Sequence, residues 1–558
     1  MIPVVSNTLR EMIIHRTKPA VLLVICLAAI FIYLLDRVWG NIASVFPDEY
    51  IHAKFARYTD LADVEIPSYL YYAVYRLTLY FDDRFLDAAR VLNATFFLAG
   101  CYFVYAVARR FTSERLAMMV AIFTALSPLN TYVNYFMAES MFFFFFWMFI
   151  AVATSERLRF NYRGNVFIGI IFGCLLLVKP HAIILLPIYP LAALVANGAR
   201  LNNVKLSLVF IVAALTVKFA VGYLVAGTQG LAIFGSLYAR HAADALGNSI
   251  DVAYAVRSVW INLLGNTFSL VSVLGLALVY LFVVTPIEGI VDSGNNSTQF
   301  LKWLIGWALF IFVPFVSVFA TTVALFDDNI NYRIYMRYYN YAFPLIHIYA
   351  LTFWNNQLSH VTKAEKAGLV SLFGGVLIYV VYHHATTLRM LPYKVLGTDT
   401  PDFFLLQYSA LWFYTAILAS ISILTLWVYR PTLAIRGFFV VFVPAYLLIT
   451  NVNNIGSIDG RSIATTADEA GKVASSIIPN AEHGAVLAIG NHDLELARFL
   501  IYLKSGDSQY EEITTNEDII VSNLDSSMRW LVVFGDSQVK GPAQKVHEST
   551  NYSIYKRE

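Results

Sequence analysis

The sequence "PAVLLVICLAAIFIYLLDRVWGNIASVFPDEYIHAKFAR", from Pro19 to Arg57, joins a long apolar run directly to a charged segment. Residues 19–39 are long and apolar enough for one transmembrane helix. Two adjacent carboxylates, Asp48 and Glu49, follow where the chain would leave the membrane. Because ionisable groups at a membrane span often belong to a functional site, this junction is the starting point for predicting the fold and the chemistry.

The composition of the whole chain is that of a membrane protein. Of its 558 residues, 58% are hydrophobic and only 14% are charged, and the mean hydropathy is +0.62. A soluble globular chain carries roughly 25% charged residues, so this chain lacks the charge to solvate a soluble protein of its size. The net charge of +2 provides no basic field, and we expect no nucleic-acid partner.

Further apolar runs predict a polytopic α-helical membrane protein of about thirteen spans. The basic N-terminal segment precedes no clear small-residue cleavage site, so we expect a retained first helix and not a signal peptide. The runs occupy approximately residues 19–39, 86–108, 115–128, 138–154, 164–180, 181–197, 205–226, 262–285, 302–325, 339–357, 367–384, 404–428 and 437–450.

The distribution of Lys and Arg orients these spans. If the N-terminus lies in the cytoplasm, every loop predicted on the inner side carries Lys or Arg, as the positive-inside rule requires. We therefore expect an integral membrane protein, in contact with membrane lipids, whose C-terminus lies outside. The long segments predicted on the outer side are 40–85, 227–261, 326–338 and 385–403.

The composition changes at about Asn451, which divides the chain into a membrane domain, residues 1–450, and a soluble domain, residues 451–558. A polar linker, "NVNNIGSIDGRS", opens the second part. After it, "DEAGKVASSII" and "DLELARFLIYLK" have the pattern of helices, and "GAVLAIG" and "RWLVVFG" have the pattern of buried strands. The pattern predicts an extracytoplasmic (periplasmic or extracellular) α/β domain.

Three carboxylates are candidates for catalysis. Asp48 and Glu49 open a helix-like stretch in which His52 can share a face with Asp48, and Arg57 with Glu49; the alternative is a solvated helix end. Glu139 stands at the outer mouth of an almost wholly apolar span, where its alternative role is a carboxylate stabilised by the helix dipole. Carboxylates among basic groups can act as general bases or hold a metal ion, here at Asp48 and Glu139.

Basic residues on the same outer side are candidates for binding a phosphate. Lys179 and His181 lie between two apolar spans, and Arg333 and Arg337 are four residues apart in a tyrosine-rich segment. Two guanidinium groups on one helical face suit a phosphate or pyrophosphate, whereas snorkelling to lipid headgroups is the alternative. The outer segments add Arg240 as a weak candidate for the phosphate, and His52, Arg57 and Tyr338 as candidates for contact with an acceptor.

Taken together, these segments resemble the GT-C superfamily of membrane glycosyltransferases, and within it the lipid A aminoarabinose transferases and the protein O-mannosyltransferases. In that branch a first helix leads to an outer loop with an Asp-Glu pair, which "PDEYIHAKFAR" matches. An acid before an aromatic span, a Gly-rich helix ending in Lys, and an Arg-Tyr segment before Pro follow in the same order, as "AESMFFFFFW", "GIIFGCLLLVK" and "RYYNYAFP". The second acid is Glu139 where many relatives have Asp, so the sugar and the acceptor do not follow from the resemblance.

The resemblance implies the GT-C fold and an inverting glycosyltransferase of a bacterial inner (plasma) membrane. The donor would be a sugar on a polyprenyl phosphate, and the acceptor a hydroxyl of a cell-envelope glycan such as lipopolysaccharide, of a lipid or of a protein. Asp48 would be the general base, while Glu49 and Glu139 would orient the acceptor or share a divalent metal (Mg²⁺, Mn²⁺, Ca²⁺ or Zn²⁺) with Asp48. The departing phosphate would be stabilised by Lys179, Arg333 and Arg337.

Two other functions fit the same cationic outer cavity. A transporter or flippase for a lipid-linked saccharide needs alternating access, for which inverted repeats are expected, and the sequence shows none that is convincing. A polymerase or ligase that takes polyprenyl-diphosphate oligosaccharides would release a polyprenyl diphosphate, whereas the first function releases a monophosphate.

Overall fold

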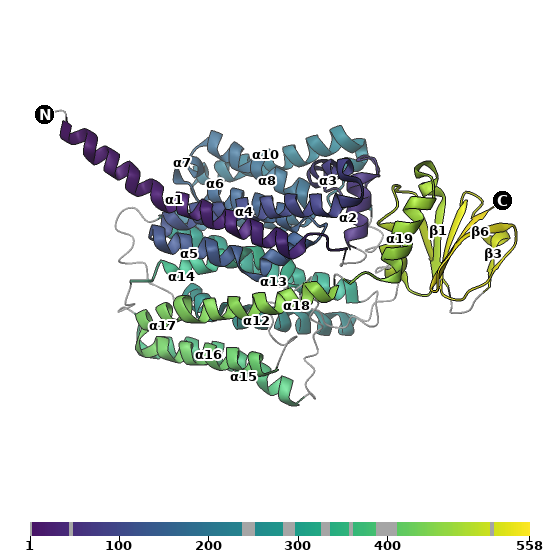
Figure 1. Cartoon of the computed structure of the whole chain (residues 1–558). Coiled ribbons are helices and arrows are strands. Elements are labelled where there is room, and N and C mark those ends of the chain that lie inside the picture. The colour runs from purple at the N-terminus through teal and green to yellow at the C-terminus, as the bar shows by residue number, and fades with distance from the viewer. Residues whose placement is uncertain are drawn as a thin grey trace.

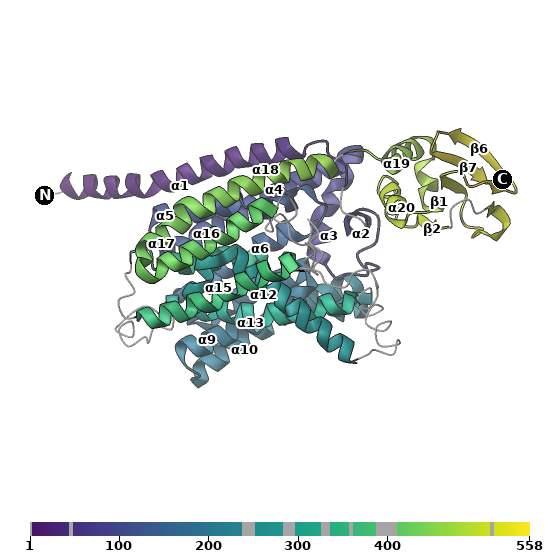
Figure 2. The same cartoon turned by 90° about the horizontal axis from the view of Figure 1, so that it is seen from below.

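Long helices lie side by side in an elongated bundle, and a domain built on a β-sheet extends from one end of it (Figure 1, Figure 2). The N-terminus lies at the opposite end of the bundle (Figure 1). The structure is a computed structural model, and it describes residues 3–43, 48–236, 252–282, 296–324, 335–355, 361–386, 410–461, 463–513 and 518–557.

The helices of the bundle follow the apolar runs of the sequence, because each predicted span overlaps a helix. Hydrocarbon offers no hydrogen bonds to the backbone, so an apolar run in a membrane satisfies its peptide groups as a helix. The bounds are α1 (Pro3–Val38), α4 (Phe85–Phe111), α5 (Glu114–Ala125), α6 (Glu139–Ala153), α8 (Tyr162–Val178), α9 (Ile188–Asn197), α10 (Leu201–Ala226), α12 (Val252–Phe282), α13 (Asn296–Ala324), α14 (Phe343–Leu351), α15 (Lys363–Thr386), α16 (Ala410–Tyr429) and α18 (Val443–Arg461).

Not every one of these helices is long enough to span a membrane alone. Within the described residues, seven helical segments have the length and apolar character of a span, and the bent pair of α5 and η2 (Pro128–Asn134) makes an eighth. Helices α6, α8 and part of α16 are apolar but shorter. The prediction of a polytopic helical membrane protein is therefore confirmed, whereas the count of thirteen spans stays a prediction.

Short helices mark the two ends of the bundle. Helices α7 (Glu156–Arg159) and α17 (Pro431–Gly437) lie at the end with the N-terminus, while α2 (Asp48–Arg57) and α3 (Tyr69–Tyr75) lie next to the sheet domain (Figure 1). Loops predicted to be inner and outer thus lie at opposite ends, and which end faces the cytoplasm stays a prediction. Parts of the predicted outer segments fall outside the described residues, namely 44–47, 237–251, 326–334 and 387–403.

The C-terminal domain contains α19 (Thr466–Ile477), α20 (Asp493–Leu500) and a five-stranded mixed sheet of order β2-β1-β4-β7-β6. Strand β1 is parallel to β2 and β4, whereas β7 is antiparallel to β4 and β6. The helices and strands predicted here coincide with α19, β1, α20 and β4. The strands are β1 (Val486–Gly490), β2 (Gln509–Glu512), β3 (Ile519–Ile520), β4 (Trp530–Phe534), β5 (Val539–Lys540), β6 (Ala543–Glu548) and β7 (Tyr552–Arg557).

The sequence predicted a polar linker after Asn451, but the structure has a helix there. Helix α18 continues through it to Arg461, and α19 begins only at Thr466, behind a capping box formed by Thr465 and Asp468. A helix that leaves the apolar phase can continue with polar side chains. The change in composition therefore marks the end of the apolar surface and not the end of the helix.

Helix α2 lies between the bundle and the C-terminal domain. Tyr50 is buried and, with Leu500 and Leu503 of that domain, lines a small space of about 190 Å³. Burial, together with the nearby Tyr510, raises the pKa of Tyr50 to about 12. The C-terminal domain therefore packs against the side of α2 that bears Tyr50, and α2 is the helix that begins with Asp48 and Glu49.

Glycines allow α8 and α10 to come into close contact. A Cβ atom on Gly169 would lie 2.6 Å from the carbonyl oxygen of Phe210, and one on Gly173 would lie 2.8 Å from that of Ala214. Small residues four apart on one helix face are a common basis of close helix packing in membranes. This contact fixes α8, and with it the residue that follows its last turn, Lys179.

We expect Gly173→Ala to lower the free energy of unfolding by about 1–3 kcal/mol, because the added methyl group has to displace the backbone of α10. The matched control is Gly375→Ala in α15, where a Cβ atom meets nothing within 4 Å. Thermal unfolding of both variants in detergent measures the effect. A Gly173→Ala melting temperature equal to that of the wild type would contradict the role given to this contact.

Candidate active site

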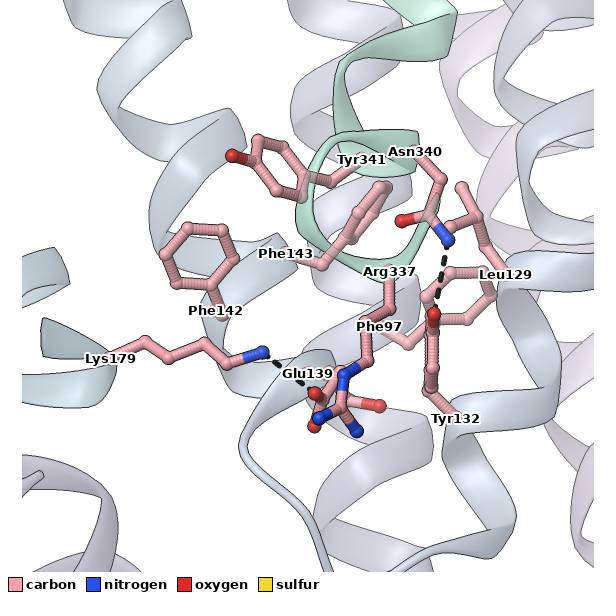
Figure 3. Close-up of a pocket in the computed structure, with 11 residues that line it drawn as sticks. Phe97, Leu129, Tyr132, Glu139, Phe142, Phe143, Lys179, Arg337, Asn340 and Tyr341 are labelled. Carbon is pink, nitrogen blue, oxygen red and sulfur yellow. Dashed lines mark hydrogen bonds and ion pairs between the residues drawn. The ribbon is translucent and has the colours of Figure 1, made fainter. Parts of the chain in front are cut away.

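Two ion pairs lie at a cavity near the end of the bundle that bears α2 and α3, and all of their residues except Asp48 line it. Asp48 Oδ2 lies 2.8 Å from Arg337 Nη1, and Glu139 Oε1 lies 2.7 Å from Lys179 Nζ. Figure 3 shows the Lys179 ammonium reaching Glu139, with Arg337 among the residues around the same space. The cavity has a volume of about 300 Å³ and is lined by Phe97, Leu129, Tyr132, Glu139, Ser140, Phe142, Phe143, Lys179, Arg337, Asn340 and Tyr341.

Asp48 is the first residue of α2. The partial positive charge at a helix N-terminus attracts a carboxylate in the first turn. The Asp48 side chain is 35% exposed and that of Arg337 is 15% exposed, so the pair is accessible from one side. Asp48 thus has a cation and a helix N-terminus next to its negative charge, and it can still be reached by a substrate.

Glu49 is turned away from the cavity and holds α2 in place. Its side chain is fully buried, and its Oε1 accepts a hydrogen bond from the backbone N–H of Phe136 at 2.8 Å. Arg90 provides a neighbouring positive charge and itself donates to the carbonyl oxygen of Asn134 at 3.3 Å. Glu49 and Arg90 thereby fasten the start of α2 to the segment that precedes Glu139. Catalysis by Glu49 stays a prediction, and its position is that of an anchor.

Breaks in two apolar helices bring Glu139 and Lys179 to the cavity. Pro180 disfavours the helical conformation at Lys179, whose backbone is extended (φ −146°, ψ 114°), so α8 ends just before it. The short 3₁₀ helix η2 and the turn after it make Glu139 the first residue of α6. In the described part of the chain, Glu139 Oε2 and the Ser140 hydroxyl have no hydrogen-bond partner. These buried polar atoms are available to a ligand.

Arg337 belongs to a short 3₁₀ turn, η5 (Met336–Tyr338), which a second one, η6 (Asn340–Ala342), connects to α14. The α-helix expected at Arg337 is therefore wrong, and its shared face with Arg333 stays a prediction because Arg333 lies outside the described residues. Contacts with other segments therefore determine the backbone conformation at Arg337 more than the local helix propensity does.

Hydrogen bonds to three neighbouring elements determine the path of this segment. Tyr339 donates to Asn266 Oδ1 on α12 at 3.0 Å, and Asn340 Nδ2 donates to the hydroxyl of Tyr132 at 3.0 Å. Trp147 on α6 donates to the carbonyl oxygen of Tyr341 at 3.1 Å. The guanidinium of Arg337 is consequently carried by a well-anchored backbone.

A second cavity, of about 320 Å³, adjoins the first. Lys179 and Arg337 line both cavities, so the two cations stand at the boundary between them. The wall of the second cavity toward α13 is apolar. Its lining residues are Phe142, Lys179, His181, Ile184, Phe312, Phe315, Val316, Arg337, Tyr338 and Tyr341.

The other predicted site residues are placed in different ways. His181 and Tyr338 line the second cavity, and the Tyr338 hydroxyl accepts a hydrogen bond from Arg337 at 3.3 Å. Arg57 is not brought to either cavity, because its guanidinium stacks on the ring of Phe85 at 3.7 Å. Arg240 lies outside the described residues.

His52 lies near the charged groups of the site. Its Nδ1 is 3.2 Å from the Tyr72 hydroxyl. Burial lowers the pKa of His52 below its ordinary value, the charges of Asp48 and Glu139 oppose this effect, and those of Lys179 and Arg337 add to it. His52 is therefore a neutral hydrogen-bonding group beside the two ion pairs.

The acids predicted as metal ligands, Asp48 and Glu139, are each engaged by a cation. Across the described ranges, no three His, Cys, Asp or Glu side chains gather into a group that could hold a metal ion. A divalent cation at these acids would be repelled by Lys179 and Arg337. The charges that are present fit an anionic ligand better than a metal ion.

Sequence reasoning missed several polar residues that complete the cavity wall. Tyr132, Ser140 and Asn340 line the space but carry no charge, and charge was the signal used to select candidates. Asn340 had one detectable signal, since it is the amide within the aromatic segment "RYYNYAFP". Ser140 likewise stands directly beside Glu139.

Comparison with other proteins was made by sequence and by structure. Neither family models nor curated proteins gave a match to the sequence. The structure is similar to that of ArnT from Cupriavidus metallidurans bound to undecaprenyl phosphate, with a TM-score of 0.53 and 14% identity over 97% of this chain and 98% of that chain. The apo state of ArnT gives a TM-score of 0.51 and 13% identity over the same shares.

A weaker likeness links the chain to the archaeal oligosaccharyltransferase AglB from Archaeoglobus fulgidus, with a TM-score of 0.44 and 10% identity over 93% of this chain and 70% of that chain. The likeness to ArnT is the informative one, because it extends over nearly the full length of both chains. The chain has the fold of ArnT, and the resemblance to the GT-C glycosyltransferases is confirmed at the level of fold.

We expect the stability of the protein to fall as the pH drops below the ordinary His pKa of 6.5, because the unfolded chain then binds a proton that folded His52 does not. The variant His52→Gln removes this contribution and should lose less stability than the wild type between about pH 7 and pH 5. Thermal unfolding at both values measures the difference, with exposed His492→Gln as the control. Equal losses for wild type and His52→Gln would contradict a neutral His52.

Proposed function

We propose that the protein is an inverting glycosyltransferase that moves a sugar from a polyprenyl phosphate to a hydroxyl group of an acceptor. The observation that carries this proposal is the cavity lined by Glu139, Lys179 and Arg337, where Lys179 is paired with Glu139 and Arg337 is paired with Asp48. Cations suit a phosphate leaving group, and a carboxylate suits the activation of a hydroxyl. The ArnT fold, solved with undecaprenyl phosphate bound, supports a polyprenyl phosphate as the carrier.

The donor phosphate would be held by Lys179 and Arg337. Because both side chains line the two adjoining cavities, one phosphate between them could place its sugar in the first cavity and its lipid in the second. The apolar wall provided by α13 suits an isoprenoid chain. Negative charge grows on the phosphate as its bond to the sugar breaks, so two fixed cations stabilise the transition state more than the bound donor.

Binding of the donor would rearrange the two ion pairs. A phosphate offers several acceptor oxygens and a full negative charge, and it can draw Arg337 from Asp48 and Lys179 from Glu139. A carboxylate that has lost its cationic partner accepts a proton more readily. Asp48 would therefore become an effective base only when the donor is in place.

Asp48 would take the proton of the acceptor hydroxyl while the hydroxyl oxygen attacks the anomeric carbon. The new carbon–oxygen bond forms on the side opposite the phosphate, the old bond breaks, and its electron pair leaves with the polyprenyl phosphate. This single displacement inverts the anomeric configuration. Glu139 would orient the sugar or the acceptor through its free Oε2, and Glu49 would act indirectly by holding α2.

We place the reaction at the outer face of a bacterial inner (plasma) membrane. A polyprenyl donor cannot leave the bilayer, so its site must open close to the membrane surface. The acceptor would be a cell-envelope glycan, lipid or protein. The C-terminal domain packs on α2 and is therefore in a position to contact an acceptor that approaches from outside.

We expect Asp48→Asn to reduce transfer by at least 100-fold, the lower range for loss of a general base, while donor binding is kept. The measurement is sugar transfer to a hydroxyl acceptor from a panel of polyprenyl-phosphate sugars, with release of polyprenyl phosphate recorded in parallel. Asp63→Asn, the same change at an exposed residue of the same outer segment, is the control. Retained activity in Asp48→Asn would exclude Asp48 as the base, and release of a diphosphate would favour a polymerase or ligase.

Arg337→Gln should weaken donor binding by roughly 10- to 100-fold, since it removes one of two charged hydrogen-bond donors to the phosphate. Binding of undecaprenyl phosphate to the purified protein measures the loss. The control is Arg430→Gln, which changes an exposed arginine just before α17, at the opposite end of the bundle. An equal effect of both substitutions would show that Arg337 acts only through net charge.

A further inference from the structure

A separate cavity lies at the end of the bundle opposite the candidate active site, between the starts of α8 and α10 and the end of α9. Figure 1 shows α7, which adjoins this cavity, far from α2. The volume of the cavity is about 220 Å³. The lining residues are Arg159, Phe160, Asn165, Tyr189, Ala193, Asn197, Asn203, Leu206 and Ser207.

Arg159 is the unusual member of this lining. The residue is only 2% exposed, and within the described residues none of its three guanidinium nitrogens has a hydrogen-bond partner. The nearest carboxylate oxygen, on Glu156, lies 4.0 Å from Nη2, at the outer limit of an ion pair. That oxygen already accepts a hydrogen bond from Ser297, and the Glu156 side chain is 49% exposed. Glu156 therefore does not accept a hydrogen bond from the Arg159 guanidinium.

Aromatic rings provide the other close contacts of this guanidinium. It lies over the ring of Phe300 at 4.2 Å and over that of Phe160 at 4.9 Å. Ring faces attract the charge, but they do not replace acceptors for the five N–H groups of an arginine. A buried guanidinium without acceptors is costly, and such a group is typical of a site that a ligand completes.

Other polar groups in the cavity are also unused. In the part of the chain that the structure describes, the Ser207 hydroxyl and the Asn197 Oδ1 are buried without hydrogen-bond partners, in contrast to Asn165, which donates to two carbonyl oxygens and accepts from Tyr189. Arg159 and Ser207 offer donors to an anion, and Asn197 offers an acceptor to a hydroxyl. The combination suits a phosphodiester that carries a hydroxyl group next to the phosphate.

The surroundings indicate where such a ligand would come from. Exposed basic residues flank the lining in sequence, and large apolar residues such as Val195 and Leu208 are exposed beside them on α9 and α10. A basic rim next to an apolar surface attracts anionic lipids and provides a path for their acyl chains. The basic residues are Arg157, Arg163, Arg200 and Lys205.

We propose that this cavity, centred on Arg159, binds the headgroup phosphate of an anionic membrane lipid in the leaflet opposite the candidate active site. The lipid fills the space between α7, α8, α9 and α10 and provides the acceptors that Arg159 lacks. A free phosphate shares the headgroup's chemistry and is the other source of the same anion. The site is independent of the proposed transfer reaction, because none of its residues lines the cavities around Lys179 and Arg337.

The test is lipid binding to the full-length protein, stripped of lipid in detergent and measured by native mass spectrometry. The added probes are phosphatidylglycerol, diacylglycerol, which lacks the phosphate, and inorganic phosphate as a competitor. We expect Arg159→Gln to lose at least tenfold in phosphatidylglycerol affinity. Arg430→Gln, an exposed arginine just before α17, at the same end of the bundle but outside the basic rim, should change it less than twofold. Diacylglycerol should bind equally to all variants.

The outcomes separate the two sources of the anion. Displacement of phosphatidylglycerol by millimolar inorganic phosphate would assign the site to a free anion as well, whereas resistance to it would assign the site to the lipid. If Arg159→Gln does not fold, Ser207→Ala replaces it and should lose about threefold in affinity. Equal affinity in Ser207→Ala and wild type, or equal losses in Arg159→Gln and Arg430→Gln, would overturn the proposal.

Discussion

A charged group that leaves water needs a partner of opposite charge, and this requirement shapes the end of the bundle where the candidate active site lies. Glu139 and Lys179 are 5% and 15% exposed and are paired at 2.7 Å. Asp48 and Arg337, which belong to segments 289 residues apart, are paired at 2.8 Å. The helix breaks, the 3₁₀ turns and the anchoring of α2 all serve to bring these charges together.

The same pairs connect the structure to the proposed chemistry. Each acid compensates the charge of a cation at 2.7–2.8 Å. In the proposed reaction, such a site would be stable before the donor arrives and would become reactive when the donor displaces Asp48 from Arg337. Arg159 at the other end is different, since no acid of the described residues compensates it at close range. That difference is why a ligand is inferred there.

Local chemistry was sufficient for much of the prediction. Apolar runs became helices, Pro180 ended α8 next to Lys179, and the start of α2 fell at Asp48. Prediction failed where a residue's surroundings come from distant segments. The sequence placed both Asp48 and Glu49 among the catalytic candidates and expected a helix around Arg337, but the contact of Glu49 with Phe136 and the bonds of Asn340 are made across the bundle.

The sequence by itself determined that this is a helical membrane protein with a soluble C-terminal domain, because the hydrocarbon phase forces apolar runs into helices whatever their neighbours are. It also singled out Asp48, Glu139 and Lys179, since charge at a membrane span is rare. Only the tertiary structure decided which acid meets which cation and which acid is an anchor. It also decided which arginine is buried without an acceptor. These depend on distances between segments far apart in the chain, and no local pattern encodes such distances.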